Sequence, residues 1–148
     1  MATILIVDDE PQVRQAVRRS LERRGHRVAE AANVASARHL VADVAVDLVL
    51  ADINMPGESG IELVRHIAAN SPGTAVIMMT AIDDPGIAEE ALALGASGYL
   101  VKPFHPNEVV IAVASGLRRR DLELARHHHI NELETKLVGR TTALRQAL

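Results

Sequence analysis

Residues 4–11 read ILIVDDEP, an aliphatic run that ends in acidic residues and a proline. The run from Thr3 to Val7 has the length and composition of a buried β-strand. Pro11 suits the first turn of a helix, where its missing N–H group costs nothing. The stretch therefore predicts a strand that leads into a helix, with Asp8 and Asp9 at the junction.

The same alternation continues along the chain. Stretches with helical spacing, such as that of Ile61, Val64 and Ile67, separate short runs rich in Val, Ile and Leu. This alternation is typical of an α/β protein with a parallel sheet. The first, third and fourth runs are nearly continuously apolar, as in strands covered on both faces, whereas the second is more polar and suits an edge. The five predicted strands are Thr3–Val7, Arg27–Glu30, Asp47–Ala51, Ala75–Met79 and Gly98–Val101.

Length and composition indicate one globular domain with an appendage, which we place at residues 1–120 and 121–148. Phe104 and Tyr99 are the only aromatic residues, so the core must be aliphatic. The net charge of -3 gives no argument for nucleic acid, and the lack of cysteine excludes thiol catalysis. No signal peptide is recognisable, and no apolar run reaches the roughly 20 residues that span a bilayer. We expect a cytoplasmic protein without a membrane partner.

The pattern changes after about Pro106. The remaining stretch predicts one long helix, or two helices broken near Gly116. Its final part has apolar residues at heptad spacing, interrupted by Arg140, which is a weak coiled-coil signal. The segment 118–129 does not continue that register, so we expect a polar connector or a stutter there. The heptad positions are Ile130, Leu133, Leu137, Leu144 and Ala147.

Polar side chains follow four of the predicted strands. Asp8 and Asp9 end the first strand, Asp52 ends the third, Thr80 follows the fourth and Lys102 follows the fifth. The carboxyl ends of parallel strands meet at one edge of a sheet, where reactive groups gather. We therefore expect these five residues to lie close together.

Three neighbouring carboxylates repel one another. A pair at about 4 Å costs on the order of 4 kcal/mol at an effective dielectric near 20, unless a cation joins them. Hard oxygen ligands favour Mg²⁺, which would also neutralise charge on an incoming phosphoryl group. Thr80 could donate its hydroxyl to that group, and Lys102 could supply a fixed positive charge. Asp52 would be the nucleophile and form an acyl phosphate.

Four stretches together resemble the CheY-like receiver domain of two-component response regulators. They occur in the family's order, and the resemblance covers about residues 1–120. It implies a flavodoxin-like, doubly wound five-stranded parallel sheet, (βα)5. The stretches are ILIVDDEP at 4–11, DLVLADINMPGESG at 47–60, VIMMTA at 76–81 and ALALGASGYLVKPF at 91–104.

The resemblance also implies roles for individual residues. Asp52 would accept a phosphoryl group from a phosphohistidine on a sensor kinase or phosphotransfer protein. Asp8 and Asp9 would hold Mg²⁺, with Asp52 and the backbone carbonyl of Asn54 completing the site. Lys102 would contact the phosphoryl group, and its bond to Pro103 is expected to be cis.

The same resemblance implies a two-state switch. Thr80 would be the switch hydroxyl, and Tyr99 the aromatic residue whose rotamer follows it, reshaping the face formed by the fourth helix, fifth strand and fifth helix. Asn54 and Ile82 fall where the family tunes the lifetime of its phosphate. The protein would be a signalling switch and not an enzyme.

The end of the chain, ELETKLVGRTTALRQAL, resembles helical linkers between receivers and output domains. Such linkers are common before cyclic-di-nucleotide phosphodiesterase (HD-GYP), histidine kinase and diguanylate cyclase modules. We expect a fragment of a longer protein, with a phosphodiesterase output favoured, and a helix that pairs in parallel with a second copy.

Simpler readings exist for each residue alone. Asp8 and Asp9 could cap a helix, Asp52 could form a turn, and Lys102 could be a solvated surface lysine. Consecutive histidines at 127–129 point in different directions on a helix and would not share a metal ion. The cluster Arg118–Arg120 reads as an exposed helix face.

Three other interpretations compete with that of a phosphoacceptor receiver. A haloacid-dehalogenase-type phosphatase also uses an aspartate nucleophile and Mg²⁺, but it needs that nucleophile near the first strand and a second Asp two residues later. Here Asn54 stands two residues after Asp52. A contact-only receiver, which is never phosphorylated and acts by contact alone, would usually lack a site residue, whereas this chain retains them all. A nucleotide-binding Rossmann domain is disfavoured, because no Gly-rich loop follows the first strand.

Overall fold

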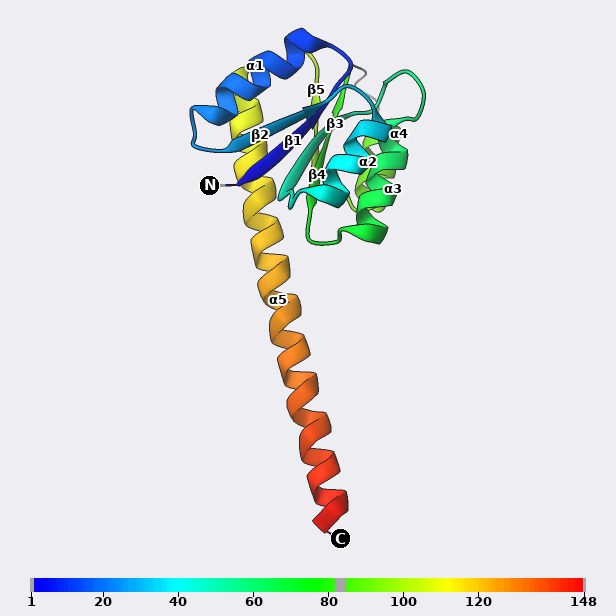
Figure 1. Ribbon diagram of the computed structural model, residues 1–148, viewed down its shortest axis with the longest axis vertical. Coiled ribbons are helices and arrows are strands. Elements are labelled where there is room, and N and C mark those ends of the chain that lie inside the picture. Colours follow the sequence, from blue (N-terminus) through cyan, green and yellow to red (C-terminus); the bar gives the residue numbers. More distant parts are fainter. Residues whose placement is uncertain (1, 82–84, 148) are drawn as a thin grey trace.

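The computed structural model describes residues 2–81 and 85–147, except for the side chains of residue 127 and of 129–147. Strands and helices alternate throughout the described chain (Figure 1). In order they are β1 (Thr3–Val7), α1 (Pro11–Glu22), β2 (Arg27–Ala31), α2 (Val34–Asp43), β3 (Leu48–Asp52), α3 (Gly60–Asn70), β4 (Ala75–Thr80), α4 (Pro85–Ala93), β5 (Gly98–Val101) and α5 (Pro106–Ala147).

The strands form one parallel sheet in the order β2-β1-β3-β4-β5. The predicted (βα)5 fold is confirmed, and the polar second strand lies at an edge as expected. Three strand ends were predicted one residue too short, since β2 ends at Ala31, β3 at Asp52 and β4 at Thr80, and β3 begins at Leu48, one residue later than predicted. Asp52 and Thr80 are the last residues of β3 and β4 and do not follow them, because each pairs with a neighbouring strand, Asp52 with Met79 and Thr80 with Val101.

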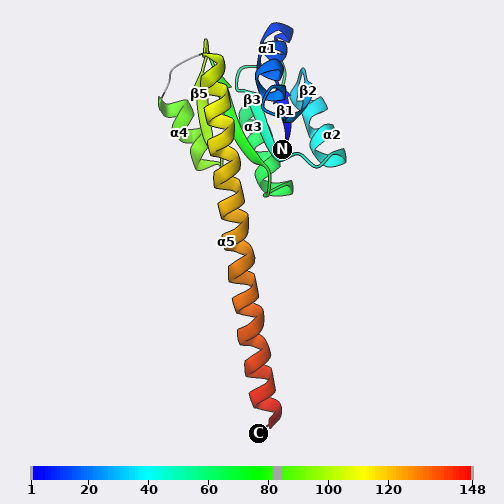
Figure 2. The ribbon, with the colours of Figure 1, turned by 90° about the vertical axis from the view of Figure 1, so that its left-hand side faces the viewer.

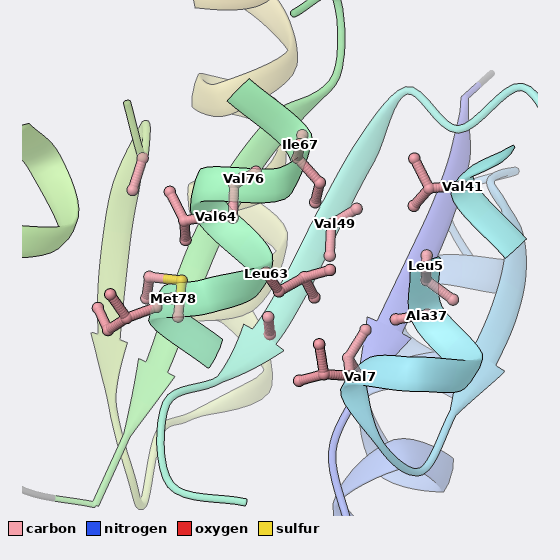
Figure 3. Close-up of a cluster of buried hydrophobic side chains, with 14 of the residues drawn as sticks. Leu5, Val7, Ala37, Val41, Val49, Leu63, Val64, Ile67, Val76 and Met78 are labelled. Carbon is pink, nitrogen blue, oxygen red and sulfur yellow. The ribbon is translucent and has the colours of Figure 1, made fainter. Parts of the chain in front are cut away.

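The helices cover the sheet on both faces. Helices α1 and α5 lie on one face, and α2, α3 and α4 lie on the other (Figures 1 and 2). Because alternate residues of a strand point to opposite faces, β1 contributes Ile4 and Ile6 to the core under α1 and α5. Leu5 and Val7 join the other core, which is equally aliphatic (Figure 3).

Helix α5 is continuous from Pro106 to Ala147 and does not break at Gly116. Instead, Gly116 allows the helix to approach the sheet. A Cβ atom there would lie 3.0 Å from Leu48 Cδ1 and 3.2 Å from Ile77 Cδ1. Beyond the domain the helix extends as a rod (Figure 1).

The cluster Arg118–Arg120 is not exposed throughout, which corrects the prediction. Arg118 and Arg119 are exposed, but the side chain of Arg120 is only 20% exposed, and its Nη1 lies 2.8 Å from Asp47 Oδ1. The reason is that Arg120 lies where α5 passes the amino end of β3, so its guanidinium reaches an acidic partner. In the described part of the chain, no helix has the length and apolarity needed to cross a membrane.

Candidate functional site: an acidic cluster at the carboxyl edge of the sheet

The end of β1 places one buried and two exposed acids in succession. Asp8 is fully buried, whereas Asp9 and Glu10 are exposed. The Asp8 amide donates to the carbonyl of Ala31, which continues the pairing of β1 with β2. Asp8 Oδ1 accepts the amide N–H of Glu10 at 2.9 Å. The N-cap of α1 is Glu10, which forms no side-chain cap, so the simple capping explanation for Asp8 and Asp9 fails.

Asp52 lies at the end of β3 and is 4% exposed. Its Oδ1 accepts the amide N–H of Asn54 at 2.9 Å. The turn that follows is closed by Gly60, whose amide donates to the Ile53 carbonyl. Asp52 is therefore a strand residue held in a fixed direction, and not a simple turn former.

Lys102 connects the two buried acids. Its Nζ lies 2.7 Å from Asp8 Oδ2 and 3.0 Å from Asp52 Oδ2, with Glu10 Oε1 at 3.9 Å. Its side chain is 14% exposed. Its backbone amide donates to the carbonyl of Thr80, which ties the start of the β5–α5 loop to β4. The reading of Lys102 as a solvated surface lysine is therefore wrong.

Burial and charge shift the protonation of this group in definite directions. Burial raises the pKa of Asp52, and the charge of Asp8 adds to this, while hydrogen bonds from Lys102 and Asn54 oppose it. For Lys102, burial acts to lower the pKa, but the hydrogen bonds and negative charges of Asp8 and Asp52 outweigh it and the pKa is raised. Lys102 therefore stays an ammonium ion between the two acids.

The acids at the end of β1 offer the chemistry of a hard-cation site. One ligand oxygen from each of Asp8, Asp9 and Glu10 can lie within 4.8 Å of the others. Carboxylate oxygens suit Mg²⁺, and Lys102 links this group to Asp52. Glu10 is not among the residues predicted from the sequence, although the run DDE at 8–10 carried the signal. The described residues therefore fit the ion that the sequence predicted.

The remaining predicted residues lie at the ends of neighbouring strands or at the surface. Thr80 is 2% exposed at the end of β4, next to β5. Asn54 is exposed in the turn after β3, and Tyr99 on β5 is 36% exposed. The Lys102–Pro103 peptide bond is cis, as predicted. Ile82 lies outside the described residues.

A largely apolar cavity of about 530 Å³ adjoins the site. It lies between the first turns of α1 and the β5–α5 loop, and Glu10 and Lys102 belong to its lining. Its apolar lining residues include Val13, Val17 and Phe104. Sequence patterns could not have indicated this cavity, because the residues that line it lie far apart in the sequence.

Known proteins of one family resemble this chain in both sequence and structure. The sequence model of the response regulator receiver domain matches residues 4–114. The phosphate regulon transcriptional regulatory protein PhoB of Pseudomonas aeruginosa is 39% identical over 119 residues, which cover 79% of this chain and 52% of that protein. A cyclic di-GMP phosphodiesterase of Thermotoga maritima is 34% identical over 135 residues, covering 91% of this chain and 36% of that protein.

Among solved structures, the CheY-like response regulator receiver domain protein of Methanospirillum hungatei JF-1 superposes with a TM-score of 0.79. It is 28% identical, and the match covers 83% of this chain and 98% of that chain. In contrast, the chain spans about half the length, or less, of the curated relatives described above. The similarity therefore covers one complete domain of longer relatives.

Proposed function

This chain belongs to the response regulator receiver domain family, and from that premise we propose that it is a phosphoacceptor switch whose acceptor is Asp52. The observation that carries the proposal is the ammonium group of Lys102, within 3.0 Å of both Asp8 and Asp52. A fixed cation beside a buried carboxylate would stabilise the charge of an incoming phosphoryl group. Asp52 is the acid held at the end of β3, in the middle of the sheet.

We propose Mg²⁺ as the cofactor of this site. Asp8, Asp9 and Asp52 would hold it through carboxylate oxygens, with the backbone carbonyl of Asn54 as a further ligand. When bound, the ion would neutralise negative charge on the phosphoryl oxygens. The acids grouped at the end of β1 support this assignment.

The proposed reaction transfers a phosphoryl group from a phosphohistidine to Asp52. One Asp52 oxygen attacks phosphorus, a P–O bond forms and the P–N bond breaks, and the histidine nitrogen keeps the electron pair. The ammonium group of Lys102 would then contact the oxygens of the new phosphoryl group. The donor would be a sensor histidine kinase or a phosphotransfer protein.

Phosphorylation adds about two negative charges at a buried position, which is a sufficient cause for a conformational switch. Thr80 would move to bind a phosphoryl oxygen, and Tyr99 would turn inward to occupy the space it leaves. The partial exposure of Tyr99 and the burial of Thr80 are the starting arrangement that such an exchange needs. The switch would reshape the face of α4, β5 and α5.

The rod of α5 supports a second element of the proposal. A helix that stands clear of its domain is marginal in water unless it packs against something. We propose that residues 121–148 form a linker that pairs in parallel with a second copy and carries the signal to an output domain. The heptad residues that would form this contact, Ile130 to Ala147, have side chains outside the described residues. No contact with nucleic acid or membrane is proposed, and the cytoplasm is the proposed compartment.

The competing functions have less support. The family match argues against a haloacid-dehalogenase-type phosphatase. A contact-only receiver would be expected to lack an acceptor, a metal-binding acid or the lysine, and this chain retains Asp52, Asp9 and Lys102.

Intact mass spectrometry tests the proposed function directly. The chain and two variants, Asp52→Asn and Asp43→Asn, are incubated with acetyl phosphate, with Mg²⁺ or with EDTA. Asp43 is an exposed acid at the end of α2 and serves as the matched control. We expect one added phosphoryl group on the wild-type chain and on Asp43→Asn, only with Mg²⁺, and none on Asp52→Asn. If the wild-type chain gains no phosphoryl group, the proposed phosphoacceptor function fails and a receiver that acts by contact alone remains.

A further inference from the structure

Asp9 carries an exposed carboxylate, but its backbone is fixed on both sides. The carbonyl oxygen of Asp8, in the peptide group before Asp9, accepts a hydrogen bond from Arg14 Nη1 at 2.6 Å. The amide of Glu10, in the peptide group after Asp9, donates to Asp8 Oδ1 at 2.9 Å. These two peptide groups flank the Asp9 Cα atom, so they determine the direction in which its side chain leaves the chain.

Arg14 is in turn held by β2. Its Nε lies 3.2 Å from Glu30 Oε1, and its side chain is 17% exposed. The other oxygen of Glu30 pairs with Arg18 Nη1. Arg18 also bonds to Glu22 and to the carbonyl of Val28, both away from the acidic cluster. The two arginines therefore share one carboxylate, but only Arg14 also bonds to the backbone of Asp8.

We propose that Arg14 is a positioning residue for the Mg²⁺ site, because its bond to the Asp8 carbonyl orients the carboxylate of Asp9. This inference rests on the proposed function. Mg²⁺ demands near-ideal octahedral geometry, and a ligand on a fixed backbone loses less conformational freedom when the ion binds. Groups that hold a metal ligand in place are typically worth about ten- to a hundredfold in metal affinity.

The sign of the effect separates positioning from simple electrostatics. Arg14 is positive, so removing it close to a cation site would by itself strengthen Mg²⁺ binding. Loss of positioning acts in the opposite direction and weakens binding. A decrease in affinity after neutralisation of Arg14 therefore has no electrostatic explanation.

The test compares Arg14→Met with the matched control Arg18→Met by isothermal titration with Mg²⁺ in the absence of any phosphodonor. Both variants remove one positive charge and one partner of Glu30, but only the first frees the Asp8 carbonyl. We expect Arg14→Met to raise the Mg²⁺ dissociation constant about tenfold and Arg18→Met to change it less than twofold. Equal or tighter binding by Arg14→Met would overturn the proposal.

A second variant, Arg14→Lys, keeps the charge and can reach only one of the two acceptors at a time. We expect its dissociation constant to lie between those of wild type and Arg14→Met, and this measurement stands even if Arg14→Met does not fold. A wild-type affinity in Arg14→Lys would also overturn the proposal. If the wild-type chain binds Mg²⁺ and becomes phosphorylated while the Arg14 variants match it, only this inference fails. If the wild-type chain does neither, the proposed function fails with it.

Discussion

Gly60 lies directly against the backbone of Asp52. A Cβ atom at position 60 would come within 2.3 Å of the Asp52 carbonyl oxygen and 2.8 Å of Met78 Cε. The start of α3 can therefore approach the end of β3 only because residue 60 has no side chain.

Gly60→Ala should consequently destabilise the fold and displace Asp52. We expect the free energy of unfolding, measured by urea denaturation, to fall by about 1–3 kcal/mol, because the backbone must shift to relieve the contact. Gly98→Ala is the matched control, since a Cβ atom there meets nothing within 4 Å. Equal effects of the two substitutions would show that the contact at Gly60 is not limiting.

Asp52→Asn should stabilise the protein in Mg²⁺-free buffer. Burial and the nearby charge of Asp8 make the ionised Asp52 costly, as its raised pKa indicates. We expect the free energy of unfolding to rise, because the neutral amide avoids the cost of the buried charge, and the further stabilisation by added Mg²⁺ to diminish. Asp9→Asn, at an exposed site, should change the Mg²⁺-free stability by less than about 0.5 kcal/mol. A less stable Asp52→Asn would contradict the electrostatic argument.

Lys102→Met should have the opposite effect, since it leaves two buried carboxylates without their shared cation. We expect a loss of about 3 kcal/mol in Mg²⁺-free buffer. Added Mg²⁺ should recover part of this loss, because the ion can take over the role of the ammonium group. Thermal unfolding with and without Mg²⁺ measures both effects. Arg65→Met, which removes an exposed ion pair with Glu62, should cost less than about 1 kcal/mol.

His26 should make stability depend on pH. Burial, and secondarily the positive charge of the chain's N-terminal amine, lowers its pKa below the usual value of 6.5. Between the folded and the unfolded pKa the unfolded chain binds more protons, so acid favours unfolding there. The stability contribution is complete above about pH 6.5 and is lost as the pH falls towards the folded pKa.

His26→Asn should remove this loss of stability between pH 7 and pH 5. An Asn oxygen can still accept the Ala2 amide that now donates to His26 Nδ1. Urea denaturation at several pH values gives the difference from wild type. His39→Asn, at an exposed position on α2, is the control. If the free energies of unfolding of wild type and His26→Asn differ by the same amount at every pH, the prediction is refuted.

The linker should control the oligomeric state. We expect sedimentation velocity to detect dimers of residues 1–148 at high concentration, and monomers of a chain shortened to residues 1–126. The shortened chain keeps Arg120 and its contact with Asp47. Leu137→Glu in the full chain should shift the equilibrium to monomer, because it places a charge at a predicted heptad position. A full chain that stays monomeric with and without phosphorylation would rule out pairing.

Much of the fold could be predicted because its signals are local. A run such as Leu48–Ala51 reveals a strand buried on both faces through its own composition, and Pro11 identifies a helix start by itself. The grouping of Asp8, Asp52 and Lys102 also followed, because parallel strands present their carboxyl ends at one edge. The one-residue errors at β3 and β4 arose where polar residues continue the backbone pairing that an apolar pattern cannot reveal.

The order and type of the elements, and the edge at which the acids meet, follow from local sequence patterns. The contacts between those elements do not. Gly60 against Asp52, Gly116 against Leu48, Arg120 with Asp47, and Arg14 with the Asp8 carbonyl each depend on how closely helices approach the sheet. Secondary structure is encoded by the spacing of neighbouring residues, whereas these contacts depend on how side chains from different elements fill the space between helix and sheet.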